Sequence, residues 1–189
     1  MKRSKKAALV LMVPAATFLF TGCGEEREQA MVYTDVKGCV QSSMSSAEQC
    51  QADFQTAAAL HPQVAPKYLS KDECETDFGA GKCETAPQQT TSGGSVFMPL
   101  MMGYMAGQMM SRGAGAQNLR GAERSNIATQ PLYKSGDDRS TFRTATNAPV
   151  AKGIGPISLR PSQVKPQMGQ VVRRGGFGQQ AAARASFGG

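Results

Sequence analysis

The five cysteines are the residues of this 189-residue chain whose types and spacing most directly suggest chemistry. Cys23 ends an apolar N-terminal run, whereas Cys39, Cys50, Cys74 and Cys83 form two pairs with the spacings C-x10-C and C-x8-C. A thiolate can be a nucleophile or a metal ligand, and two thiols can form a disulfide, so the surroundings of each cysteine decide its use.

Cys23 closes a segment that has the parts of an export signal: a basic start, an apolar run over residues 7–20 and the small pair Thr21-Gly22. The run is shorter than the roughly 20 residues of a transmembrane helix. Small residues before a cysteine are typical of a lipobox, although Phe20 stands where Leu is usual. We therefore predict a lipoprotein signal peptide over residues 1–22 and a lipid on Cys23, with an ordinary cleaved signal as the alternative.

This signal predicts a bacterial cell-envelope protein that is held to a membrane by its lipid anchor. Several acyl chains hold a protein firmly, because each buried CH₂ contributes about 0.8 kcal/mol. Gly24 follows the cysteine, whereas Asp at that position is the retention signal of the inner membrane. The periplasmic face of the outer membrane is therefore favoured over the inner membrane.

The four remaining cysteines are an even set in an exported chain, which predicts two disulfides. Zinc is the alternative, but these spacings lack the close pairs of most structural zinc sites, and His61, the single histidine, lies far from them. We predict neither a metal nor another cofactor. A catalytic base near a nucleophile is also missing from the pattern, so we do not expect an enzyme.

The elements that position these cysteines are predicted to be helices. Ser45–Glu48 and Ser70–Glu73 have the S-x-x-E form of a capping box, which favours helices over about 46–60 and from Ser70 to Gly79. A weaker helix is expected over 35–41. A hairpin of the first two helices and a turn at 79–82 favour the bonds Cys39–Cys50 and Cys74–Cys83 among three possible pairings.

Residues 96–110 are unusually rich in methionine and glycine. On a helix, one stripe would carry Met98, Met102, Met105 and Met109, and a neighbouring face would carry Gly103 and Gly107. We predict a short contact helix that packs on the cysteine domain, on a second copy or an envelope partner, or shallowly in the bilayer. A copper(I) site of thioether ligands and a flexible apolar linker are the alternatives.

The two halves of the mature chain differ in charge. Residues 23–90 hold 5 basic and 11 acidic side chains (5 − 11 = −6), and residues 91–189 hold 12 and 3 (12 − 3 = +9). The second half has few large apolar residues, so we predict that residues 111–189 form a basic, low-complexity, disordered tail. Such a tail could meet anionic lipid, lipopolysaccharide or peptidoglycan, or remain solvated without a ligand; nucleic acid is not expected in the envelope.

The chain resembles the YgiB-type family of bacterial lipoprotein-like proteins of unknown function. The resemblance rests on Ala65-Pro-Lys-Tyr68, Asp72-Glu-Cys74, Phe78-Gly79, Cys83, Phe97-Met-Pro-Leu-Met-Met-Gly-Tyr-Met-Ala-Gly107, Gln130-Pro-Leu132 and Arg174-Gly-Gly-Phe-Gly178. It implies an envelope location and no activity.

Together these patterns predict a small α-helical disulfide-stapled domain followed by a short apolar Met/Gly helix and a long disordered tail. After the signal peptide, the segments are a tether (23–32), the stapled domain (33–87), a linker (88–95), the Met/Gly segment (96–110) and the tail (111–189). The function expected is that of a non-catalytic structural or interaction protein tethered to the membrane. The alternative is a periplasmic protein that binds copper or an anionic polymer.

Overall fold

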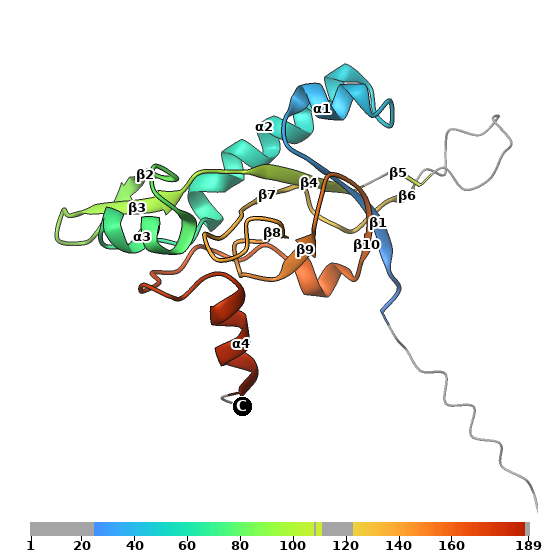
Figure 1. Cartoon of the computed structure of the whole chain (residues 1–189). Helices are drawn as coiled ribbons and strands as arrows, with labels where there is room; N and C mark the ends of the chain where they lie inside the picture. The colour runs from blue at the N-terminus through green and yellow to red at the C-terminus, as the bar shows by residue number, and fades with distance from the viewer. Residues whose placement is uncertain (1–24, 108, 111–122, 188–189) are drawn as a thin grey trace, which may run out of the picture.

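The computed structural model describes residues 25–107, 109–110 and 123–187 (Figure 1). The predicted signal peptide and Cys23 lie outside these residues. In chain order the elements are β1 (Glu28–Tyr33), α1 (Val36–Gln41), α2 (Ala47–Val64), α3 (Lys71–Phe78), β2 (Cys83–Gln89), β3 (Ser95–Pro99), β4 (Gly103–Gly107), β5 (Met109–Met110), β6 (Glu123–Arg124), β7 (Gln130–Leu132), β8 (Phe142–Arg143), β9 (Pro149–Ala151), β10 (Gly155–Leu159), the 3₁₀ helix η1 (Pro161–Val164) and α4 (Gln179–Phe187).

A four-stranded antiparallel sheet lies at the centre, with the strand order β10-β1-β4-β7. Strand β1 pairs with β4, where Met31 lies opposite Ala106, and with β10, where Ala30 lies opposite Ile157. Half of the predicted tether, residues 28–32, therefore belongs to a central strand, and its partner β10 comes from the predicted tail. The protein is a mixed α/β fold, and the prediction of a mainly helical domain is wrong.

The two faces of this sheet are covered by different parts of the chain, because successive side chains of a strand point to opposite faces. On one face, Met31, Tyr104 and Ala106 pack with both cysteines of α1 and α2, and these helices lie above the sheet in Figure 1. On the other face, Val32 and Met105 pack with residues that follow β4, among them Leu132, Phe142, Leu159 and Val164.

A third cluster joins α3 and the β2–β3 hairpin to later parts of the chain. Tyr68 and Phe78 pack there with Tyr133 and Phe177, and all four are at least 95% buried. Two backbone hydrogen bonds between Tyr68 and Phe97 form an antiparallel β-bridge on β3. The early helices are thus held by residues from the C-terminal half.

The predicted helices themselves are present, and local capping explains where they begin. Ser46 accepts a hydrogen bond from the Gln49 amide, so α2 begins one residue later than the first predicted box. Ser70 caps α3 as predicted, and Gly79 ends it with a positive φ of 103°. Within the described ranges, no helix combines the length and apolarity needed to cross a membrane.

The predicted Met/Gly helix is wrong, because the described part of this segment forms strands. A Cβ on Gly103 would lie 2.5 Å from the Tyr33 carbonyl oxygen, and one on Gly107 would lie 2.5 Å from the Ile127 carbonyl oxygen. Gly103 therefore permits close approach to the neighbouring strand β1, and Gly107 permits close approach to the segment before β7; neither glycine lies between helices. The spacing of methionines and glycines fits a helix, but pairing with β1 makes residues 103–107 a strand.

The predicted disorder of the tail is also wrong for residues 123–187. Ile127, Leu132, Tyr133, Phe142 and Phe177 are all buried there. The segment has too few apolar residues for a core of its own, but each of these side chains enters a core that earlier strands and helices supply. The burial is shared, so composition counted over the tail alone underestimates the driving force for folding.

The Arg174–Gly178 motif shows how this segment docks. The Asp77 carboxylate accepts hydrogen bonds from the Gly175 amide at 2.7 Å, the Phe177 amide at 3.2 Å and the Tyr68 hydroxyl at 2.9 Å. The Phe177 ring lies 4.6 Å from the Phe78 ring, centroid to centroid. The buried Asp77 of α3 therefore binds the backbone of the motif, and the contact between Phe177 and Phe78 adds apolar packing.

Candidate functional site

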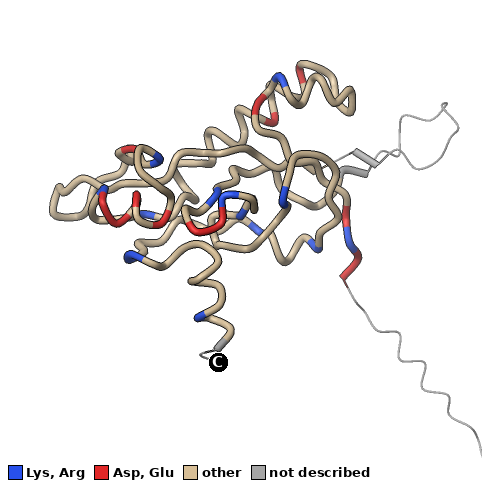
Figure 2. Tube along the Cα trace, viewed as in Figure 1, with Lys and Arg blue, Asp and Glu red and all other residues tan. Residues whose placement is uncertain are grey.

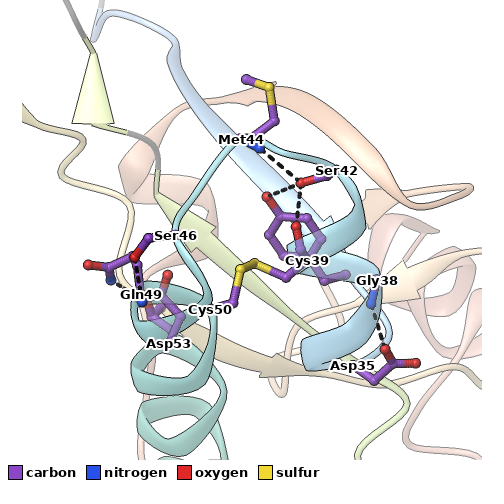
Figure 3. The surroundings of a disulfide bond; sticks show 11 residues. Asp35, Gly38, Cys39, Ser42, Met44, Ser46, Gln49, Cys50 and Asp53 are labelled. Carbon is purple, nitrogen blue, oxygen red and sulfur yellow. Dashed lines mark hydrogen bonds between the residues drawn. A yellow bond between two sulfur atoms is a disulfide. The ribbon is translucent and has the colours of Figure 1, made fainter.

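The Cys39–Cys50 disulfide is buried between α1 and α2 and shapes the loop that joins them. Its Cα atoms are 5.7 Å apart, and both cysteines are fully buried. In Figure 3 the Ser42 hydroxyl donates to the Cys39 carbonyl oxygen, at 2.6 Å. Ser43 has a positive φ of 55°, and Met44, next in the loop, is 59% exposed. The disulfide therefore holds a short loop in one shape with an apolar side chain outward.

A cleft of about 500 Å³ opens beside this loop. Its apolar lining comes from the sheet and the segment before β7: Met31, Tyr33, Ala106 and Ile127. Its polar lining includes Gln49 and Asp53 of α2 together with Ser125 and Thr129. The Asp53 carboxylate accepts a hydrogen bond from the side-chain amide of Gln49 at 2.9 Å and lies 3.5 Å from the Thr129 hydroxyl. An apolar floor with a hydrogen-bonding rim can hold a peptide or another amphipathic ligand.

The second disulfide, Cys74–Cys83, joins α3 to β2 with a Cα separation of 6.2 Å. Both cysteines are buried within the cluster around Tyr68 and Phe78. The two predicted disulfides are thus present with the predicted pairing. We assign both disulfides a structural role, because all four cysteines are buried and a thiol reagent could not easily reach them.

A cluster of polar side chains surrounds His61, the single histidine. Its Nδ1 lies 2.8 Å from the Tyr133 hydroxyl and its Nε2 lies 3.2 Å from Glu84 Oε1. Lys67, also buried, donates to the Pro62 carbonyl oxygen and lies 3.8 Å from the Met98 sulfur. Burial lowers the pKa of His61 although Glu84 opposes the shift, and burial also lowers the pKa of Lys67.

This arrangement resembles an acid–base pair but is closed to a substrate. His61 is 8% exposed and Tyr133 is 0% exposed. General acid–base catalysis requires that the base reach a reacting group, and here both ring nitrogens already have protein partners. The network instead joins α2, β2 and the segment after β7. The predicted helix over about 46–60 stops short of His61, whereas α2 continues to Val64 and includes it. The partners of His61 are distant in the sequence and have no local signal.

The predicted contact stripe does not form one surface. Met98 and Met105 are 4% and 0% exposed and belong to different core clusters, whereas Met102 is partly buried. Gly107 lines the cleft. Only the backbone of Met109, in β5, is described. The part of the chain that the structure describes holds no group of three or more His, Cys, Asp or Glu residues that could bind a metal.

The acidic and basic halves of the chain interleave in the fold. Figure 2 shows acidic positions gathered on α3 and just before β1, with basic positions distributed over the body. Within the basic half, an ion pair of 3.3 Å joins Arg143 to Asp138, and both side chains are largely buried. Hydrogen bonds hold the pKa of Asp138 well below its usual range, and the bond from the Ser140 side chain has the largest effect.

Comparison with known proteins identifies relatives along nearly the whole chain. A family model described as "Protein of unknown function (DUF1190)" matches residues 27–188. A UPF0441 protein of Serratia proteamaculans is 30% identical over 98% of this chain and 86% of its own length. One of Yersinia pestis bv. Antiqua is 31% identical with the same coverage, and one of Erwinia tasmaniensis is 32% identical over 92% of this chain and 80% of its own length. No solved structure matches significantly.

The match spans every described strand of the central sheet, both disulfides and the Arg174–Gly178 motif. The relatives extend it across the N-terminal region as well. The sequence resemblance to a family of unknown function is therefore confirmed, and the chain belongs to the DUF1190 family.

Proposed function

We propose that this protein is a non-catalytic interaction protein of the bacterial envelope, tethered to the outer membrane by a lipid on Cys23. The observation that carries the proposal is the position of Glu25. Its carboxylate accepts hydrogen bonds from the Ser162 amide, at 2.9 Å, and from the Ser162 hydroxyl. The fold therefore starts two residues after the lipobox cysteine, and cleavage before Cys23 would leave every described element in the mature protein.

The two disulfides support the same compartment, because such bonds persist in oxidising surroundings. The polar groups support a role without catalysis. The His61 ring and its partner Tyr133 are buried, whereas the cleft beside the Cys39–Cys50 disulfide is open and has a preformed rim. A rim held by a covalent bond loses little conformational freedom when a partner binds, which favours recognition.

Metabolic labelling with palmitate tests the anchor. The wild-type protein should incorporate label, its processing should stop in globomycin, and Cys23→Ser should carry no label. Gly24→Asp is the matched variant for sorting: it should stay labelled but move to the inner-membrane fraction. Label that survives in Cys23→Ser, or its absence from the wild type, would remove the anchor from the proposal.

Site-specific photocrosslinking in living cells tests the cleft. A photoreactive residue at Met44, on the cleft rim, should give a discrete adduct. The same residue at Leu69 is the control, because Leu69 is 58% exposed, close to the 59% of Met44, but does not line the cleft. Equal adducts from both positions would show that the cleft is no preferred contact surface.

A further inference from the structure

The short connection between Cys23 and the fold restricts how the domain can face a membrane. Two residues of extended chain span at most about 7 Å. Ser162, at the start of η1, fixes the Glu25 side chain through two hydrogen bonds. A lipid on Cys23 would therefore lie close to this one edge of the protein, whereas a long tether would leave the domain free to rotate.

The surface around Glu25 has groups suited to lipid headgroups. We define the anchor face as Arg27, Ala128, Arg160, Ser162 and Lys165, all of which are exposed. Among the described residues, neither Arg160 nor Lys165 forms an ion pair. A shallow hollow lies on this face, with Ala128, Pro161, Val164 and Pro166 among its lining residues. Exposed cations beside small apolar side chains are a combination that suits the phosphate level of a bilayer.

Two of the carboxylates in this region accept hydrogen bonds from residues that are distant in the sequence. Glu28 accepts hydrogen bonds from the Ser125 hydroxyl at 2.8 Å and from the Asn126 side-chain amide at 2.7 Å. Glu25 is bound to Ser162 in the same way, and Glu26 is the remaining carboxylate of this stretch. Two of the three acids are thus hydrogen-bonded to neutral donors and keep their charge, whereas Arg160 and Lys165 form no ion pair with any of the described acids.

The segment 125–129 lies between the anchor face and the cleft and contributes residues to both. Ser125, Ile127 and Thr129 line the cleft, whereas Asn126 and Ala128 line the hollow of the anchor face. The side chains of Ser125 and Asn126 both reach Glu28, but from Asn126 to Thr129 the two openings take alternate residues and share none. The cleft and the hollow of the anchor face are therefore separate openings that meet along this segment.

We infer, on the basis of the proposed lipid at Cys23, that the anchor face lies against the phospholipid headgroups of the bilayer that holds the anchor. Arg160 and Lys165 then lie at the level of the phosphates. The cleft is turned away from the lipid and stays open to a partner in the periplasm. One tether position thus sets both the membrane contact and the accessible binding surface.

Headgroup quenching of a site-specific probe tests this orientation. The mature chain is bound to vesicles of phosphatidylethanolamine and phosphatidylglycerol that contain a headgroup spin-labelled lipid. An environment-sensitive fluorescent amino acid is placed at position 128, in the anchor face, or at position 92, in the β2–β3 turn. Figure 1 shows this turn at the opposite end of the molecule from the start of β1. Quenching should be at least several-fold stronger at 128, and equal quenching would overturn the inference.

A charge variant tests the contribution of the two cations. With the probe at 128, Arg160→Glu combined with Lys165→Glu should lower quenching several-fold, since each cation near an anionic surface changes the partition by roughly fivefold. Lys37→Glu combined with Lys82→Glu is the control, with the same charge change at exposed lysines elsewhere. Loss of quenching in both variants, or in neither, would contradict the assigned contact.

The preparation separates this inference from the proposed function. One sample carries the lipid attached by the cell, and a second carries a maleimide-coupled phospholipid on Cys23. Failure of only the cell-derived sample to bind vesicles would refute natural lipidation, whereas the coupled sample still reports the orientation. Vesicle-bound protein without preferential quenching at 128 would refute the anchor face alone.

Discussion

Phe177 offers a direct test of whether the C-terminal segment is an integral part of the fold. It is 4% exposed, and its ring centroid lies 4.6 Å from that of Phe78 and 6.3 Å from that of Tyr133. Phe177→Ala would remove this ring from a cluster that joins α3 to the end of the chain. Truncation of a buried phenylalanine costs about 3–5 kcal/mol through lost burial and the remaining cavity.

The expected change is large relative to the total stability of a domain, about 5–15 kcal/mol. For a chain of this size, 1 kcal/mol corresponds to roughly 2–4 °C, so Tm should fall by about 6–20 °C. Far-ultraviolet circular dichroism follows the helices, and the fluorescence of the four tyrosines follows the cores, since the chain has no tryptophan. Urea titrations of the wild type and the variant then give the free energy of unfolding.

Met168→Ala is the matched control, because it removes a large apolar side chain from the same segment at a position that is 71% exposed. Its effect should stay within about 0.5 kcal/mol. If Phe177→Ala changes the free energy of unfolding by less than about 1 kcal/mol, the segment does not dock on α3 and the third core cluster is wrongly assigned.

Three further predictions follow from other parts of the fold. Replacing both Cys39 and Cys50 by serine should cost about 3 kcal/mol in urea titrations, because a loop with a sequence separation of 11 is no longer closed in the unfolded chain; an unchanged midpoint would refute this. Gly103→Ala should cost at least 2 kcal/mol, because its Cβ would meet the Tyr33 carbonyl oxygen, whereas Gly153→Ala, with open space around it, should stay within about 0.5 kcal/mol. The wild type should lose stability as the pH falls from 7.5 to 5.5: the folded pKa of His61 lies below its ordinary 6.5, so the unfolded chain binds the proton first. His61→Gln should have a flatter pH profile, and identical slopes would contradict the burial effect.

The local features of this protein can be predicted from its amino-acid sequence. A capping serine and a terminating glycine act within a few residues, so the extent of α3 could be read from Ser70 and Gly79. The disulfide pairing followed from the same short-range geometry, since both bonds close loops of about ten residues. The resemblance of its motifs to a family of unknown function was readable as well, because residue order in a motif is independent of the fold.

Which segments share a core depends on contacts between residues that are distant in the sequence. Strand β4 has a spacing of methionines and glycines that also fits a helix, and its pairing with β1 settled the choice. Phe177 and Tyr133 lie in polar stretches that predict disorder when taken alone, yet they complete a cluster founded on Tyr68 and Phe78. Burial depends on partners distant in the sequence, so neither composition nor local periodicity could assign these residues, or the Glu25–Ser162 contact that places the fold beside Cys23.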